Sequence, residues 1–398
     1  MITRRVSEQI RRDLLKKMVI LAGPRQCGKT TLSNDLLKTY PGSYMSWDDP
    51  TTRLKIQKGD LNLDSELWVF DELHKYRRWR NFLKGLYDLQ HEKHKIFVTG
   101  SAKLEAFSRG GDSLQGRYYS HRLHPFTFSE IEGYPLVEID QVPNLPHLPK
   151  SSSEAILHDL ITLGGFPEPF LSGSLKEANR WKLAYGARLI HEEVSSLEDI
   201  KNLDRLELLF DRLTDVAGSI VSINSLREDL EVAFETVKNW MTVFENFYSI
   251  FRVAPYGPPK IKSVKKEQKL YFWDWSRTSQ EGARFENLIA LHLLRWTHWM
   301  EDIEGEKIEL RYFRNRDGHE VDFVILKKKK PWMAIEVKLS DSEVSPSLKY
   351  FLERETVPYA FQVFLKDHPK NSKERRWPDI RGCQVRSVSA ARFLANLP

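Results

Sequence analysis

The amino-acid sequence predicts an α/β protein built in three parts, and a separate pattern indicates each part. Over residues 1–134, short apolar runs alternate with helical patterns, which predicts a parallel sheet with helices on both faces. Over residues 154–256, the apolar side chains keep helical spacing. Over residues 257–398, alternating strands follow one long helix, which predicts a second α/β domain. Residues 135–153 are rich in proline and serine and are predicted to be a linker or an excursion.

The composition is that of an ordinary globular protein, with 41% hydrophobic and 29% charged residues. No run of about 18 apolar residues occurs, so no membrane span is predicted. Cys27 and Cys383 are too few for a disulfide framework, and we expect a cytoplasmic protein. The formal net charge of +6 allows nucleic acid as a partner without requiring it.

A phosphate-binding loop (Walker A) is predicted directly after the apolar run at residues 18–22. The loop fits the pattern G-x-x-x-x-G-K-[ST], and a helical pattern follows it. In such a loop the backbone N–H groups surround the β-phosphate, Lys29 reaches the β- and γ-phosphates, and Thr30 binds Mg²⁺. The predicted cofactors are ATP and Mg²⁺, although no base-reading motif excludes GTP. The predicted loop residues are Gly23, Pro24, Arg25, Gln26, Cys27, Gly28, Lys29, Thr30 and Thr31.

Two further segments would complete a hydrolytic site of the P-loop NTPase type. The apolar run at residues 67–70 ends in Asp71 and Glu72 (Walker B), at the strand end where open α/β sheets bind ligands. Asp71 is predicted to hold the magnesium through water, and Glu72 to orient or deprotonate the attacking water. Ser101 follows the apolar run at residues 95–99 and is predicted to touch the γ-phosphate or that water.

Arg109 and Arg117 each lie beside a glycine in a predicted loop. A loop arginine can stabilise transition-state charge in its own site or in that of a neighbouring subunit. A plain loop arginine is the competing interpretation for both. Arg117 is taken as the catalytic candidate, and this role is compatible with a homo-oligomer.

The order of these motifs resembles that of a family of bacterial and archaeal AAA-type ATPases. The segments that carry the resemblance are GPRQCGKTT, WVFDE, VTGS and LQGR ahead of HPFTFSEI, with GGFP at residues 164–167 further on. In this family the N-terminal half is an ATP-binding domain, and the C-terminal domain usually has no characterised function. The resemblance therefore implies ATP binding and hydrolysis.

The middle part, over residues 206–253, is predicted to form a helix, a turn, a second helix and a longer third helix, with a strand after it. This layout matches a helix-turn-helix or winged-helix unit, which can bind DNA. Lys238 and Asn239 would lie on the exposed face of the third helix. Glu235 and Glu245 on the same helix would repel phosphate, so a scaffolding role is the alternative.

A second candidate site lies in the C-terminal part. Asp322 is predicted on the polar face of one strand, Glu336 and Lys338 on the polar face of the next, and Glu286 on the long helix. Carboxylates and a lysine in this arrangement can use Mg²⁺ for phosphodiester cleavage. The predicted metal ligands are Glu286, Asp322 and Glu336, and the predicted catalytic residues are Asp322, Glu336 and Lys338. The arrangement resembles the PD-(D/E)xK nuclease superfamily, which implies a restriction-endonuclease-like α/β domain that cleaves or only binds.

Both sites together predict an ATP-dependent enzyme that acts on DNA, in which an AAA-type ATPase is joined to a nuclease-like domain. One alternative is a regulatory switch that uses ATP to change partners, with the C-terminal domain as a catalytically silent docking module. Another is a divalent-dependent nuclease in which ATP only gates access.

Overall fold

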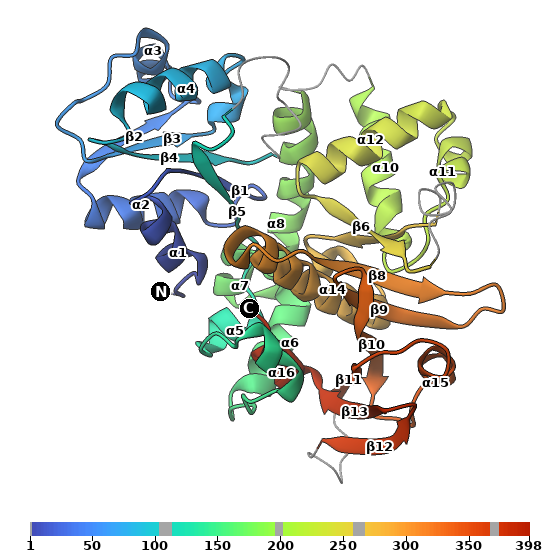
Figure 1. Ribbon diagram of the computed structural model, residues 1–398. Coiled ribbons are helices and arrows are strands. Elements are labelled where there is room, and N and C mark those ends of the chain that lie inside the picture. The colour runs from blue at the N-terminus through green and yellow to red at the C-terminus, as the bar shows by residue number, and fades with distance from the viewer. Residues whose placement is uncertain (1, 103–113, 196–201, 258–266, 367–373) are drawn as a thin grey trace. The chain divides into compact units, whose positions relative to one another are not determined.

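The computed structural model describes residues 2–102, 114–195, 202–257, 267–366 and 374–398 (Figure 1). The chain divides into two compact units. Unit 1 comprises Met1–Pro125 and Val243–Ser249, and unit 2 comprises Phe126–Thr242 and Ile250–Pro398. In the described parts of the chain, no helix combines the length and the apolar character that crossing a bilayer requires.

Unit 1 is built on a five-stranded parallel sheet with the strand order β2-β3-β4-β1-β5. Figure 1 shows α3 and α4 on one face of this sheet and α1 and α2 on the other, which confirms the predicted arrangement. All residues of β1 and β3 are buried, because helices cover both faces. The elements are α1 (Val6–Asp13), β1 (Met18–Ala22), α2 (Lys29–Thr39), β2 (Gly42–Ser46), α3 (Pro50–Lys58), β3 (Leu67–Asp71), η1 (Leu73–Lys75), α4 (Trp79–Gln90), β4 (Lys95–Gly100) and β5 (Tyr118–Arg122).

The strand order of unit 1 decides which predicted residues can meet. Strand β4 lies between β1 and β3, and all three run in the same direction. The phosphate loop after β1, Ser101 after β4 and Glu72 after β3 therefore emerge at the same edge of the sheet.

The first part of unit 2 is mostly helical. Residues 135–153, the predicted linker or excursion, contain η2, and the backbone of His147 exchanges hydrogen bonds of 2.8 and 3.0 Å with the Asn396 side chain. This segment is thus fastened to the C-terminal end of the chain. The helices that begin in unit 2 are α5 (Phe128–Glu132), η2 (Ile139–Asn144), α6 (Ser153–Leu163), α7 (Pro167–Ser172), α8 (Leu175–Arg188), the π-helix η3 (Leu189–Val194), α10 (Leu203–Asp215), α11 (Ile223–Asp229) and α12 (Phe234–Asn246).

The second part of unit 2 is a mixed eight-stranded sheet with the order β12-β13-β11-β10-β9-β8-β6-β7. The α/β character predicted for this part is confirmed. Strands β9 and β10 pair antiparallel, whereas β10 and β11 pair parallel. Its elements are β6 (Ile250–Pro255), β7 (Lys269–Phe272), η4 (Trp275–Arg277), α14 (Glu281–Trp299), η5 (Met300–Glu304), β8 (Ile308–Arg314), β9 (Glu320–Lys327), β10 (Lys330–Ser340), α15 (Pro346–Leu352), β11 (Tyr359–Lys366), β12 (Arg375–Ile380), β13 (Cys383–Ser389) and α16 (Ala390–Ala395).

Candidate nucleotide site and C-terminal charge cluster

The phosphate loop joins β1 to α2 and requires glycine at two positions. Gly28 has a φ of +105°, and a Cβ at Gly23 would lie 2.3 Å from the carbonyl oxygen of Leu123. Lys29 is only 5% exposed. Its Nζ donates to the carbonyl oxygens of Gly23 at 2.9 Å and Pro24 at 2.8 Å. The ammonium is thus held against the loop, where phosphate oxygens could replace the carbonyls as acceptors.

Arg4 fastens the loop from outside the motif. This buried guanidinium donates from Nη1 to the carbonyl oxygen of Cys27 at 2.9 Å and from Nη2 to the carbonyl oxygen of His124. Burial raises the pKa of the Cys27 thiol, although the Lys29 and Arg4 charges oppose this. The loop pattern gives no sign of Arg4, which precedes Cys27 by 23 positions.

Asp71 ends β3, and hydroxyl groups from both neighbouring strands surround it. Tyr44 of β2 donates to one carboxylate oxygen and Thr99 of β4 to the other. Burial, followed by the hydrogen bond to Asp71, raises the pKa of Tyr44, so its hydroxyl remains a donor. The Thr30 side chain also bonds the Tyr44 hydroxyl and acts on its pKa in the opposite direction. The Tyr44 hydroxyl, which was not predicted, therefore contacts both Thr30 and Asp71, the predicted magnesium ligands of this site.

Glu72 and Ser101 meet as the strand order requires. Ser101 Oγ donates to Glu72 Oε2 at 2.9 Å, and His74 Nδ1 lies 3.5 Å from the same oxygen. Burial raises the pKa of Glu72; the Lys29 charge opposes this and the Asp71 charge adds to it. A carboxylate with a raised pKa is a better proton acceptor. Glu72 also has a φ of +53°, which is uncommon for residues other than glycine.

Arg117 does not join this site within its own chain. It directly precedes β5, where Tyr118 pairs with Met18, whereas the residue beside the phosphate loop, Ala22, pairs with Arg122 at the other end of the strand. Arg117 Nε instead lies 2.6 Å from Asp88 Oδ1 of α4. The parallel register thus places Arg117 at the opposite edge of the sheet from the phosphate loop, which leaves a role in a neighbouring subunit or that of a plain loop arginine. Arg109 lies outside the described residues.

The predicted C-terminal residues lie together in unit 2. Because β9 and β10 pair antiparallel, Asp322 and Glu336 are neighbours, and Asp322 Oδ2 accepts the Val337 N–H at 2.8 Å. Lys338 Nζ donates to Glu336 Oε1 at 2.7 Å. Burial, followed by the Asp322 charge, raises the pKa of Glu286 and of Glu336 to about 7.

An unpredicted lysine lies among these carboxylates. The ammonium of Lys269, at the start of β7, forms ion pairs with Glu286, Glu320 and Asp322. Within the described ranges, no group of three or more His, Cys, Asp or Glu side chains is arranged to hold a metal ion. The residues do not fit the predicted metal site at Glu286, Asp322 and Glu336, because the Lys269 ammonium already lies against two of these carboxylates, Glu286 and Asp322.

In the middle part, Lys238 and Asn239 lie on the exposed side of α12 as predicted. Lys238 Nζ forms an ion pair of 2.7 Å with Glu235 one turn earlier. Part of the charge that would attract phosphate is therefore already balanced on the same helix.

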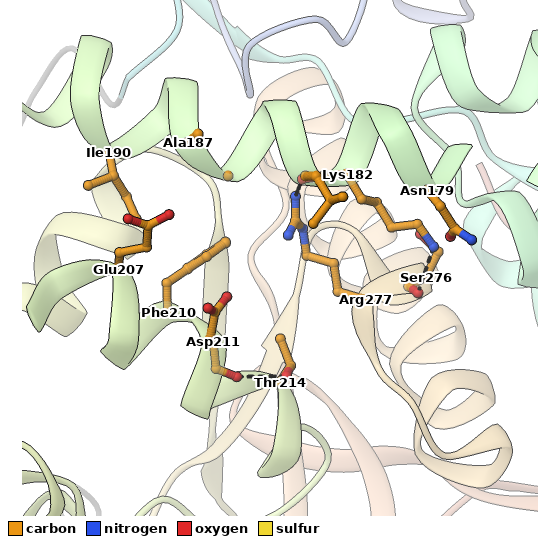
Figure 2. Close-up of a pocket in the computed structure, with 12 residues that line it drawn as sticks. Asn179, Lys182, Ala187, Ile190, Glu207, Phe210, Asp211, Thr214, Ser276 and Arg277 are labelled. Carbon is orange, nitrogen blue, oxygen red and sulfur yellow. Dashed lines mark hydrogen bonds between the residues drawn. The ribbon is translucent and has the colours of Figure 1, made fainter. Parts of the chain in front are cut away.

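An open cavity of about 370 Å³ lies between α8, α10 and η4, and no sequence motif marks it (Figure 2). Arg277 Nη2 donates to the carbonyl oxygen of Lys182 at 2.7 Å, and burial lowers the pKa of Lys182. Glu207 and Asp211 of α10 also line it. The cavity is therefore lined by side chains of both charges.

The GGFP segment packs against η4 and the residue before it. Gly164 has a φ of +88°, and a Cβ there would lie 2.8 Å from Asp274 Oδ1 and 3.0 Å from Ser276 Oγ. Phe166 packs against the Trp181 ring at a centroid distance of 4.9 Å. This motif therefore has a packing role.

Comparison with family models divides the chain in the same order as the motifs. Residues 15–132 match the AAA domain. Residues 154–277 and 281–377 match two domains of unknown function, DUF8612 and DUF4143. The first match supports an AAA-type P-loop ATPase family. It also supports ATP as the nucleotide.

The similar curated proteins are uncharacterized. One, from Methanocaldococcus jannaschii, is 27% identical over 385 residues, covering 84% of this chain and 78% of that protein. Two others, from Mycobacterium bovis and Mycobacterium tuberculosis, are each 24% identical over 275 residues, covering 68% of this chain. The matched region spans only 57% of each mycobacterial protein. Among solved structures, the Hef helicase domain of Pyrococcus furiosus is 12% identical and covers 91% of this chain and 89% of its own, but its TM-score of 0.22 is too low to argue a shared fold.

Proposed function

We propose that this protein hydrolyses ATP at the edge of the unit 1 sheet and that the hydrolysis is coupled to DNA binding through unit 2. The observation that carries the first half is the hydrogen bond from Ser101 to Glu72 beside a buried Lys29. It joins a phosphate-binding cation, a proton acceptor and an orienting hydroxyl at one sheet edge.

Each group at this edge has a proposed task. Lys29 would leave its loop carbonyls to bind the β- and γ-phosphates, and Glu72 would take the proton of the attacking water while Ser101 holds the carboxylate in place. The Thr30 hydroxyl and the Asp71 carboxylate are oxygen donors of the kind that Mg²⁺ prefers, so these residues fit the ion. When bound, Mg²⁺ would offset the charge of the phosphates.

The DNA half of the proposal is supported by a strained basic turn. Lys328 and Lys329 join β9 to β10, with Lys327 paired to Lys330, and their φ values are +53° and +64°. Two-residue turns with both φ values positive favour Asn-Gly, and each non-glycine residue in this conformation costs roughly 1 kcal/mol or more. Both positions are exposed and strained, yet both are lysine. Positive charge at this turn would be useful for contact with the phosphate backbone of DNA.

The element order around α12 also supports this half. α10, α11 and α12 precede the antiparallel pair β6–β7, and Ile220, between α10 and α11, forms a bridge to Lys269 of β7. This order of three helices and an antiparallel edge is compatible with the predicted winged-helix unit. The proposal stops at DNA binding, because Lys269 pairs with Glu286 and Asp322, two of the three predicted metal ligands.

Steady-state phosphate release, with and without DNA, tests both halves. We expect Lys29→Ala to abolish release and Glu72→Gln to lower it at least about 100-fold while ATP still binds. The exposed Glu92→Gln is the matched control and should keep the wild-type rate. DNA should stimulate the wild type. A wild type that releases no phosphate from ATP would contradict the ATPase assignment, and a Glu72→Gln protein with wild-type turnover would contradict the role of Glu72. Phosphate release without DNA stimulation and without DNA binding at low salt would contradict only the coupling.

A further inference from the structure

Lys269 is the centre of the C-terminal carboxylate cluster. Its Nζ lies 3.1 Å from Glu286 Oε1, 2.6 Å from Glu320 Oε1 and 3.6 Å from Asp322 Oδ1, and the side chain is 3% exposed. Three carboxylates from a helix and a strand thus converge on one ammonium group, which water hardly reaches. A buried ion pair of this kind is stable only when its geometry and hydrogen bonds are good.

The backbone holds this lysine in place from two sides. Lys269 pairs with Val253 of β6 and also forms the bridge to Ile220. Two residues later on the same strand face, the Tyr271 hydroxyl donates to Glu286 Oε1 at 2.7 Å. The strand therefore presents an ammonium and a hydroxyl to the same carboxylate, and the backbone pairing fixes the position from which the lysine side chain reaches it.

One oxygen of each predicted metal-binding carboxylate already accepts a hydrogen bond, and the Lys269 charge lies beside two of these carboxylates, Glu286 and Asp322. Glu286 Oε1 accepts from both Lys269 and Tyr271, and Asp322 Oδ2 accepts the Val337 N–H. Beside them, Glu336 Oε1 accepts from Lys338. A divalent cation among the same oxygens would face the Lys269 charge at a few ångströms in a poorly screened site, where like charges exclude each other.

We propose that Lys269 is itself the cation of this cluster and that the C-terminal sheet of this protein works without a divalent metal. The site keeps the acidic and basic side chains of a nuclease-like arrangement, but the fixed ammonium replaces the ion. The inference is independent of ATP hydrolysis.

Manganese binding tests this assignment directly. In Mn²⁺ EPR titrations of the nucleotide-free full chain, every protein would carry Asp71→Asn, so that the nucleotide site lacks its predicted magnesium-binding carboxylate. We expect no bound Mn²⁺ in this parent and one site in the Lys269→Met variant, at least tenfold tighter than any binding by the parent. The site should disappear again when Asp322→Asn is added. Lys338→Met is the matched control: it also removes a lysine beside these carboxylates but leaves Lys269, so it should gain no site.

Two outcomes would overturn the proposal: Mn²⁺ bound by the parent and lost with Asp322→Asn, or a folded Lys269→Met protein that gains no site. A second measurement leaves Lys269 unchanged. The thermal midpoint of the parent should be the same in EDTA and in Mn²⁺, and a rise in Mn²⁺ that Asp322→Asn abolishes would also overturn the proposal.

Discussion

The position and the pKa of single side chains in this protein depend on the residues that the fold places around them. Lys29 and Glu72 both follow predicted strands. The loop carbonyl of Gly23 holds the Lys29 ammonium, and burial raises the pKa of the Glu72 carboxyl group. His292 of α14 is a further example. It is 1% exposed, its Nδ1 donates to the Leu288 carbonyl oxygen at 2.8 Å, and its Nε2 accepts the Phe128 N–H at 3.1 Å.

His292 predicts a loss of stability in acid. Burial lowers its pKa from 6.5 to about 4, with the Arg295 charge adding to this and the Leu288 hydrogen bond and Glu130 opposing it. The folded state therefore favours neutral histidine, so its contribution to stability is full above pH 6.5 and is lost as pH falls toward 4. The loss should be about 3 kcal/mol at 1.36 kcal/mol per pKa unit.

Urea unfolding between pH 7 and pH 4 measures this effect. The wild type should lose more stability over this range than His292→Gln, which cannot titrate there. The exposed His158→Gln should behave like the wild type. Parallel curves for the wild type and His292→Gln would contradict the assignment.

At the scale of elements, pairing decides which residues can act together. Because β4 lies between β1 and β3, the residues that follow these three strands come together in the nucleotide site. The register of β5 instead places Arg117 at the opposite edge of the sheet. The β9–β10 hairpin shows the same control in the other half of the chain. Its register exposes Lys328 and Lys329 in a strained turn, with exposed Lys307 next to the paired strand end at Ile308.

The hairpin predicts opposite effects on stability and on DNA binding. Lys328→Asn with Lys329→Gly supplies the residues that the turn favours, so the thermal midpoint should rise with a gain of about 1–2 kcal/mol. The same double variant should bind DNA more weakly. The slope of its log affinity against log salt concentration should decrease by the amount expected for about two lost phosphate contacts. Fluorescence anisotropy at several salt concentrations measures this change.

Two controls separate charge from turn geometry. Replacing both turn lysines with arginine keeps the charge and should keep DNA affinity. Replacing Lys58 and Lys93, two exposed lysines elsewhere, with glutamine removes the same charge and should change affinity little. An Asn-Gly hairpin that binds DNA as the wild type does would exclude the hairpin as a contact surface.

At the scale of the whole molecule, Arg117 leads to a prediction about assembly. Since it does not reach the site of its own chain, its remaining catalytic role is in the site of a neighbouring copy. We expect Arg117→Ala alone to lower ATP hydrolysis by about 1,000-fold or more. Mixing it with Lys29→Ala should restore activity, because the Lys29→Ala copy supplies an intact Arg117 to an intact phosphate loop.

The Arg117–Asp88 ion pair provides the control for this experiment. Asp88→Ala breaks the pair but leaves the arginine, so it should keep the wild-type rate in phosphate release. A wild-type rate for Arg117→Ala would contradict any catalytic role for this arginine, in its own copy or in a neighbour.

The sequence alone was sufficient for features made by residues close together in the chain. The phosphate loop is a strand, a turn and a helix start in one short segment, and the acidic pair ends one apolar run, so local pattern identifies both. The buried side of α14 was also predictable, since Phe285, Leu288, Ile289 and Trp296 follow helical spacing. Pattern likewise placed Asp322, Glu336 and Lys338 on adjacent strands.

Only the tertiary structure decided what surrounds those groups. Arg4 at the loop, Tyr44 and Thr99 at Asp71, and Lys269 among the carboxylates come from elements far apart in sequence. Each is an ordinary residue in its own segment, so no local pattern distinguishes it. Charge balance inside a buried cluster depends on distances between strands and helices. For that reason the C-terminal carboxylates, which could be predicted as metal ligands from sequence, are found around a lysine.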